Sequence, residues 1–280
     1  MTLSSRISNF KTAENKFKFQ KLFNQIIYEV NERVAIITLN RPEKRNALNP
    51  ELIRELGDAF EIALKDDLTR CVILTGAGNS FCSGADLEYI QKISDLNSYE
   101  NYIDAEKLSD LYLKIYRFPK PTIAMVNGFA LAGGCGLASV CDFIIASKEN
   151  AKFGYTEPRI GFIPAIVMVF LLRRIAPGKA RELLLRGNII NADEAVEIGF
   201  ANYSVPDVEL KNFTLKFAND LISEVSPESV KFVKEMISNV YSMGLEQAIE
   251  YAKSMNSISR LTEDCKKGIE SFLKKEKIRW

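Results

Sequence analysis

The fold is decided by residues 121–147, which read PTIAMVNGFALAGGCGLASVCDFIIAS. The apolar run Pro121–Val126 predicts a buried strand that ends at Asn127-Gly128. The small residues from Gly133 to Ser139 are compatible with a short helix, and the run 142–147 predicts a further strand. A strand, a helix and a strand in this order predict an α/β fold with helices packed on a sheet.

The chain on the N-terminal side of this stretch extends the same pattern. Two β-rich runs, Ile26–Val30 and Val34–Leu39, are separated by a short polar link and predict a hairpin. Apolar residues recur at helical spacing in 50–65, and 71–75 is a short apolar run that predicts another buried strand. Residues 98–117 predict a long helix.

The chain on the C-terminal side predicts helices only, from Lys179 onwards. The expected helices are 180–185, 192–198, 209–225, 227–241 and 245–257. The apolar segment 160–172 is shorter than the ~20 residues of a membrane span and predicts a buried turn and helix. We expect an N-terminal extension over 1–25, a core over 26–205 and a helical C-terminal region over 206–280.

Composition excludes several classes of chemistry. The 280 residues contain no histidine, which removes imidazole bases, Ser-His and Cys-His pairs and His-ligated metals. The five cysteines lack metal or redox spacing and predict free thiols in a reducing compartment. The 37 basic and 36 acidic residues give a formal net charge of +1, which provides no argument for a nucleic-acid or membrane partner. We expect a cytoplasmic protein, with organellar import through residues 1–25 as the alternative.

Two glycine-containing loops follow predicted strands. The first is Ser80–Asp86, and the second is Gly128–Gly136. Backbone N–H groups in such loops can stabilise negative charge on a carbonyl oxygen. A single loop of this kind more often serves turn geometry or tight packing, so the pair together carries the functional interpretation.

With both loops in register, the chain resembles the crotonase family, the superfamily of enoyl-CoA hydratases and isomerases, from about Ile26 to the C-terminus. The matching segments are 37–42 with 46–48, 81–86, 127–128 with 132–135, 141–142, and 153–161. The resemblance implies a crotonase-like ββα superhelix whose helical C-terminal region mediates trimerisation, as a homotrimer or a dimer of trimers. It also implies an acyl-CoA substrate, with no separate cofactor and no metal.

The resemblance also implies a set of site residues. The thioester oxygen is expected between the N–H groups of Ser83 and Gly133. The expected CoA-binding residues are Lys44, Arg45, Ala47, Leu48, Gly84, Ala85, Asp86, Leu87 and Gly134. For Lys44 and Arg45, contact with CoA phosphates and a solvated loop position are both open.

The acid-base residues depart from the family pattern. Family hydratases commonly carry two glutamates, and Glu157 matches the second, whereas Gly136 stands where the first would be. Glu157 is therefore the single expected catalytic carboxylate, although a surface ion pair beside Arg159 is the alternative. The acids Asp86, Glu88, Asp104 and Glu106 are helper candidates, for which a solvated position is the simpler interpretation. The additional acids of family dienoyl-CoA isomerases are also missing, with Gly136 at one position and Ala165 at the other.

Three functions follow from the resemblance. The overall pattern favours hydration of a straight or branched 2-enoyl-CoA, in fatty-acid or branched-chain acid metabolism. The missing glutamate favours isomerisation of a 3-enoyl-CoA to a 2-enoyl-CoA by Glu157 alone. A non-catalytic acyl-CoA-binding homologue is the third hypothesis, because a fold does not guarantee chemistry.

Overall fold

The computed structural model describes residues 23–280, so the expected N-terminal extension lies outside the described residues except for its last three positions. Within that range, no helix is both long enough and apolar enough to cross a membrane. The α/β class expected from the sequence is confirmed, with two sheets and helices packed around them.

The chain enters the fold through an antiparallel hairpin. Strand β1 (Ile26–Asn31) pairs with β2 (Val34–Leu39), as the sequence predicts. After the 3-10 turn η3 (Pro42–Lys44), helix α2 (Pro50–Lys65) begins at Asn49, whose side chain accepts from the Leu52 N–H. The apolar face of α2 is buried, which fixes the helix against the hairpin.

Three successive segments of the chain then repeat the same pair of strands. Each contributes a longer strand to a first sheet and a three-residue strand to a second. The pairs are β3 (Cys71–Gly76) with β4 (Ser80–Cys82), β5 (Thr122–Val126) with β6 (Phe129–Leu131), and β7 (Phe143–Ser147) with β8 (Lys152–Gly154). The resulting six-stranded sheet has the order β1-β2-β3-β5-β7-β10, and the four-stranded sheet has the order β4-β6-β8-β9.

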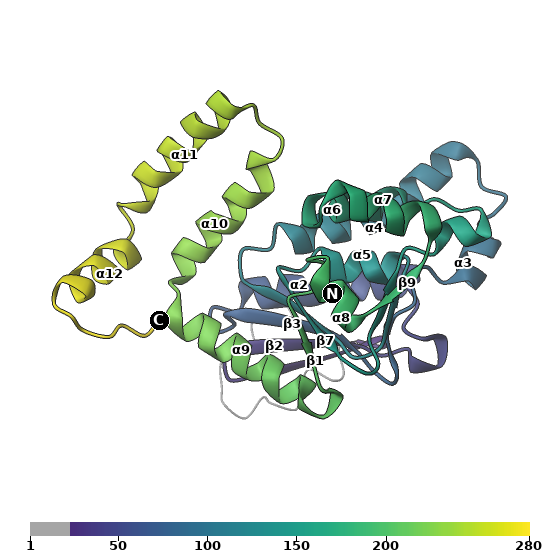
Figure 1. The fold of residues 1–280 in the computed structure, drawn as a ribbon, viewed down its shortest axis with the longest axis horizontal. Coiled ribbons are helices and arrows are strands. Elements are labelled where there is room, and N and C mark those ends of the chain that lie inside the picture. The colour runs from purple at the N-terminus through teal and green to yellow at the C-terminus, as the bar shows by residue number, and fades with distance from the viewer. Residues whose placement is uncertain (1–22) are drawn as a thin grey trace, which may run out of the picture.

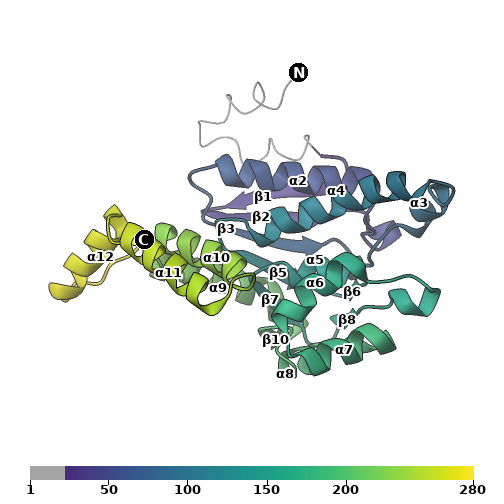
Figure 2. The ribbon, with the colours of Figure 1, turned by 90° about the horizontal axis from the view of Figure 1, so that it is seen from above.

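Helices follow these strand pairs and cover the sheets. They are α3 (Leu87–Lys92), α4 (Ser98–Tyr116), α5 (Gly133–Ser139), η4 (Glu157–Ile160), α6 (Ala165–Arg174), α7 (Pro177–Arg186) and α8 (Ala192–Glu197). Figure 2 shows α2 and α4 side by side over the strands near the N-terminus. Because every turn sends its helix from the same end of the sheets, loops distant in sequence meet at that end.

The six-stranded sheet separates two hydrophobic clusters. The larger one lies toward α2, α4, α5 and α6 and includes Leu52, Phe60, Tyr112 and Leu171. The smaller one joins the opposite face of the sheet to α9 (Leu210–Glu224), which follows the turn η5 (Asp207–Glu209). Figure 1 shows α9 running along that face.

The last three helices leave the main body. Figures 1 and 2 show α10 (Pro227–Val240), α11 (Leu245–Ser259) and α12 (Glu263–Leu273) extending to one side as an arm. The arm is tied to the body by Lys234 of α10, which donates to the carboxylate of Asp142 and to the Lys120 carbonyl. Since Lys234 is buried, this charged contact fixes the point where the arm leaves the body.

Two expectations from the sequence are wrong. The region after Lys179 is not helical throughout, because it contains β9 (Ile189–Asn191) and β10 (Tyr203–Val205). The segment 160–172 is not buried as a whole, since Ile160 and Ile163 are 66% and 68% exposed. Three-residue strands are too short to show an alternating pattern, and an apolar run does not reveal which side faces the core.

Candidate active site

The first glycine loop leaves β4 and enters α3 in contact with the second loop. Gly84 has φ +92°, and a methyl group placed on it would lie 2.8 Å from Cβ of Ala132 and 3.1 Å from the Gly133 nitrogen. At Gly134, such a group would lie 1.9 Å from the Cys82 carbonyl oxygen. The two loops expected from the sequence therefore meet, and glycine is required for that approach.

The second loop presents, at the start of a helix, an N–H that has no acceptor among residues 23–280. Gly133 is the first residue of α5, where the backbone N–H has no partner within the helix. The residue before it, Ala132, has φ 50° and ψ −124°, and its N–H donates to the Gly154 carbonyl at 2.7 Å. The Gly133 N–H can therefore donate to a ligand oxygen, and its role as an oxyanion donor stays a prediction.

The structure corrects the prediction for Ser83. Its N–H already donates to the Arg45 carbonyl at 3.0 Å, so it is not free for a thioester oxygen. Ala85 is different, because its neighbours make the ladder bonds to Leu48: Leu48 donates to the Gly84 carbonyl, and Asp86 donates to the Leu48 carbonyl. Within residues 23–280 the Ala85 N–H has no acceptor, and in such a bridge it points away from Leu48. Ala85, two positions along, is the free donor of this loop.

Glu157 lies in a buried environment rather than in a surface ion pair. It follows β8 as the first residue of η4 and is 8% exposed. Its Oε2 is buried and finds no hydrogen-bond partner in the described part of the chain. Burial raises the pKa of Glu157 above its ordinary value of 4.5. A carboxyl group with a raised pKa can accept and return a proton more readily near neutral pH.

The position of the missing glutamate is filled by other side chains. A methyl group on Gly136 would lie 2.1 Å from Cγ1 of Val167 and 3.2 Å from Cε2 of Tyr112. Tyr112 is fully buried, and its hydroxyl donates to the Gly133 carbonyl at 2.5 Å. Burial, followed by the charges of Cys82 and Glu157, raises the pKa of Tyr112. A side chain larger than glycine at 136 requires Val167 to move.

Asp86 is occupied by structural contacts. Its carboxylate caps α3 by accepting from the Glu88 and Tyr89 N–H groups, and it pairs with Arg41 at 2.9 Å. Burial opposes ionisation, but the Arg41 hydrogen bond and the backbone donors outweigh it and lower the pKa of Asp86. This carboxylate therefore fixes the first glycine loop to the preceding loop and is a poor proton carrier.

The remaining predicted residues divide by exposure. Ala47 and Leu48 are buried under the first loop, and Leu87 is exposed on α3. Lys44 pairs with Glu88 on the surface at 2.5 Å, whereas the side chain of Arg45 is exposed and forms no hydrogen bond or ion pair within the described residues. Of the helper acids, Asp104 accepts from the Tyr89 hydroxyl at 2.5 Å, and Glu106 is exposed.

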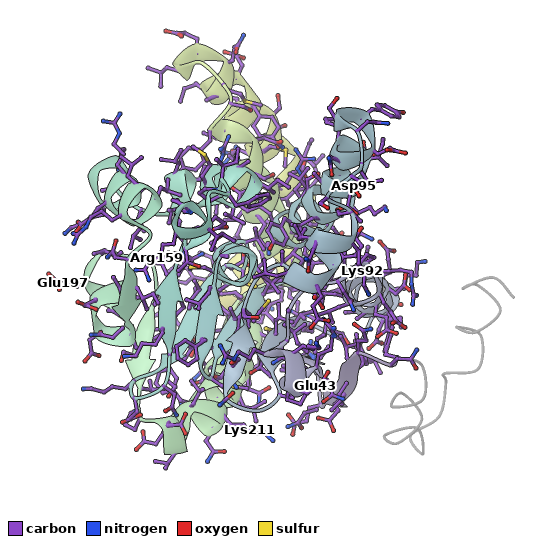
Figure 3. All side chains as sticks on the ribbon, turned by 90° about the vertical axis from the view of Figure 1, so that its right-hand side faces the viewer. Glu43, Lys92, Asp95, Arg159, Glu197 and Lys211 are labelled. Carbon is purple, nitrogen blue, oxygen red and sulfur yellow. The ribbon has the colours of Figure 1, made fainter. Side chains whose placement is uncertain are left out.

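Figure 3 views the end of the molecule where these segments gather. Glu43 of the loop before α2, Lys92 at the end of α3 and Arg159 of η4 are all labelled on this side. Within the described chain, no group of three His, Cys, Asp or Glu side chains is arranged to hold a metal.

Sequence reasoning missed Ala85 as a donor and Tyr112 altogether. The bond between Ser83 and Arg45 depends on the path of a loop almost forty residues earlier, which has no local signal. Tyr112 looks like an ordinary core residue of an amphipathic helix, because its hydroxyl meets Gly133 only in the folded chain.

Comparison with known proteins identifies the family of this chain. The family model for enoyl-CoA hydratase/isomerase matches residues 29–280. The crotonyl-CoA hydratase of Syntrophomonas wolfei is 36% identical over 257 residues, which cover 91% of this chain and 97% of that protein. The short-chain-enoyl-CoA hydratase of Clostridium acetobutylicum is 36% identical over 261 residues, with the same two coverages.

Solved structures give the same assignment. The crystal structure of enoyl-CoA hydratase from Bacillus anthracis superposes with a TM-score of 0.83 at 31% identity, covering 91% of this chain and 98% of that one. Both the family expected from the two glycine loops and the expected fold are confirmed. The chain belongs to the enoyl-CoA hydratase/isomerase family and has the crotonase fold.

Proposed function

We propose that this protein hydrates a 2-enoyl-CoA, with Glu157 as the proton carrier and the N–H groups of Ala85 and Gly133 as the oxyanion donors. The observation that supports the proposal is the buried Glu157 carboxylate, whose Oε2 has no partner among residues 23–280. The relatives named crotonyl-CoA hydratase and short-chain-enoyl-CoA hydratase support a short acyl chain.

One carboxylate is sufficient for the atoms of this reaction to balance. Glu157 removes a proton from water as the water oxygen bonds to carbon 3 of the enoyl group. The electron pair of the double bond moves toward the thioester, whose oxygen gains charge between the two N–H donors. Glu157 then returns the proton to carbon 2, which yields a 3-hydroxyacyl-CoA and restores the carboxylate.

Isomerisation of a 3-enoyl-CoA is the second candidate, and the packing at Gly136 favours it. Val167 and Tyr112 occupy the space beside Gly136, where a second carboxylate would help to orient water. Without that water, Glu157 can remove a proton from carbon 2 and return it to carbon 4. The intermediate is then a dienolate, whose thioester oxygen gains charge between the same two donors.

A product assay distinguishes the two reactions. We would incubate the protein with crotonyl-CoA and separately with 3-hexenoyl-CoA in heavy water and identify the products by mass spectrometry. Hydration is expected to give deuterated 3-hydroxybutyryl-CoA from crotonyl-CoA. Glu157→Gln is expected to lower kcat by roughly 10²- to 10⁴-fold, the usual contribution of general acid-base catalysis.

The control is Glu197→Gln, an exposed glutamate at the end of α8, which should leave kcat unchanged. Conversion of 3-hexenoyl-CoA to its 2-enoyl isomer, with no 3-hydroxyacyl product from either substrate, would replace hydration by isomerisation. Tight binding of both thioesters with no turnover would contradict both reactions and leave the non-catalytic hypothesis.

A further inference from the structure

The peptide that carries the Gly133 N–H opens the first turn of α5, where its carbonyl, that of Ala132, accepts from the Gly136 N–H at 3.1 Å, and the peptides on both sides of it are also held. On one side, the Ala132 N–H donates to the Gly154 carbonyl at 2.7 Å. On the other, the Tyr112 hydroxyl donates to the Gly133 carbonyl at 2.5 Å. The first bond is part of the β6 and β8 region, whereas the second comes from α4, a separate element of the fold.

The backbone of Ala132 is strained when the Gly133 N–H points toward the first glycine loop. Its φ of 50° and ψ of −124° lie in a region that L residues rarely adopt and glycine adopts readily. A half-turn of the peptide between residues 132 and 133 would move Ala132 into the left-handed helical region, which is less strained. The same half-turn would point the Gly133 N–H away from the first glycine loop.

The Tyr112 contact opposes that half-turn. Turning the peptide breaks the bond from the Gly136 N–H to the Ala132 carbonyl and takes φ of Gly133 out of the helical region, so the first turn of α5 loosens and the Gly133 carbonyl becomes free to leave its helical position. A hydrogen bond from a fixed donor holds the carbonyl where a helical Gly133 places it. The donor is fixed because the Tyr112 ring is fully buried and packs against Phe170, at a centroid distance of 6.1 Å, and beside Gly136.

We propose that Tyr112 is a positioning residue, which keeps the Gly133 N–H aimed at the thioester oxygen against the backbone strain at Ala132. The inference rests on the proposed acyl-CoA chemistry, in which the Gly133 N–H is an oxyanion donor. It does not depend on whether the reaction is hydration or isomerisation, since both place negative charge on the thioester oxygen.

The test combines three single variants and one double variant with two kinds of measurement, kinetic and spectroscopic. Tyr112→Phe removes only the hydroxyl, and Ala132→Gly removes the strain. Tyr116→Phe is the matched control, because Tyr116 lies one turn further along α4 and packs on the same Phe170, at 5.4 Å, without a hydrogen bond to the Gly133 loop. The measurements are kcat and KM for the better substrate, and the red shift of bound 2,4-hexadienoyl-CoA, whose absorption reports hydrogen bonding to its carbonyl.

We expect Tyr112→Phe to lower kcat about tenfold with less than a threefold change in KM, because a misaimed donor loses part of the ~10²- to 10³-fold effect of an oxyanion donor. The red shift should decrease in parallel, while Tyr116→Phe keeps both values. Adding Ala132→Gly to Tyr112→Phe should restore most of the kcat, because glycine has no strain to release. Loss of a packing residue would not be repaired in this way.

Full activity and full red shift in Tyr112→Phe would overturn the proposal, as would an equal loss in Tyr116→Phe or no recovery in the double variant. If Tyr112→Phe does not fold, Ala132→Gly is compared with the double variant, and a tenfold difference in kcat between them would also overturn it. An unmodified protein that neither shifts the probe nor turns over either substrate would instead contradict the proposed function.

Discussion

At the scale of single residues, the proposed chemistry depends on a carboxylate whose pKa is raised by burial. Glu157 lies at the start of η4, and one of its carboxylate oxygens has no hydrogen-bond partner within the described chain. Asp86 is also buried, but its two oxygens accept hydrogen bonds from the backbone of α3 and from Arg41. The two acids consequently shift in opposite directions: burial raises the pKa of Glu157, and hydrogen bonds lower that of Asp86. This difference supports the proposed role of Glu157 in proton transfer, whereas the contacts of Asp86 support the loop.

The raised pKa of Glu157 predicts the pH dependence of activity. The carboxylate must be ionised to accept a proton from water or from carbon 2, so kcat/KM should fall as the pH decreases through the pKa of Glu157. Because burial raises that pKa, the acid limb of the profile should lie above pH 4.5, the ordinary value for glutamate. A profile of kcat/KM against pH tests this, provided that the enzyme is shown to stay folded at each pH. An acid limb at or below pH 4.5 would contradict the prediction.

Thermal unfolding provides an independent control for the same group. A folded-state pKa above the unfolded value means that the folded protein binds the proton more tightly, so Glu157 contributes most to stability at low pH. That contribution is lost as the pH rises through the folded pKa. Glu157→Gln, which cannot ionise, should therefore gain in melting temperature relative to the unmodified protein as the pH rises from 4 to 8.

At the scale of elements, the longer strands and helices could be predicted from sequence and the short strands could not. The run 71–75 and the helix 98–117 agree with β3 and α4 within one residue at each end, because each has enough apolar residues to show its pattern. Strands β4 and β6 were expected as parts of loops, and they have only three residues each. Their pairing through Ser80 and Phe129 is a tertiary contact that brings the two glycine loops together.

The candidate site, too, could be predicted from the sequence only where local segments indicate it. Gly133 and Glu157 could be found from the sequence because each stands in a recognisable local segment. The choice between Ser83 and Ala85 could not, since it depends on which N–H the Arg45 carbonyl takes. The filling of the Gly136 position by Val167 likewise depends on how α6 packs against α5.

The contact between the two loops makes a prediction for Gly84. An alanine there meets both Ala132 and the Leu131 carbonyl within 3 Å, in addition to the cost of a positive φ. We expect Gly84→Ala to destabilise the protein by about 1–3 kcal/mol through overpacking and to lower kcat by moving Ala85 and Gly133 apart. Chemical denaturation and steady-state kinetics measure the two effects.

The matched control is Gly199→Ala. Gly199 has φ +77° and nothing within 4 Å of the added methyl group, so it carries the backbone cost without the crowding. If Gly84→Ala were no worse than Gly199→Ala in stability and kept full kcat, close approach of the loops would not be what requires glycine at 84.

At the scale of the whole molecule, the arm of α10, α11 and α12 exposes many apolar side chains. Its exposed apolar side chains include Val233, Ile237, Tyr241, Leu245, Ile249 and Phe272, and several are more than half exposed. Figure 1 shows the arm projecting from the body, so the other described elements do not cover those residues. Extensive exposed apolar surface of this kind is typical of an interface with another protein chain.

We therefore expect the arm to mediate self-association, as the resemblance to trimeric family members implies, with a solution mass of three or six times 31.6 kDa. Val233 and Ile237 lie one turn apart on α10 and are 54% and 51% exposed. Placing Asp at both positions should lower the mass measured by light scattering, because buried, unpaired carboxylates oppose association. Lys231→Asp, on an exposed position of the same helix, is the control and should keep the assembly. A monomeric unmodified protein, or an assembly that survives both Asp substitutions, would show that this face of the arm is not the interface.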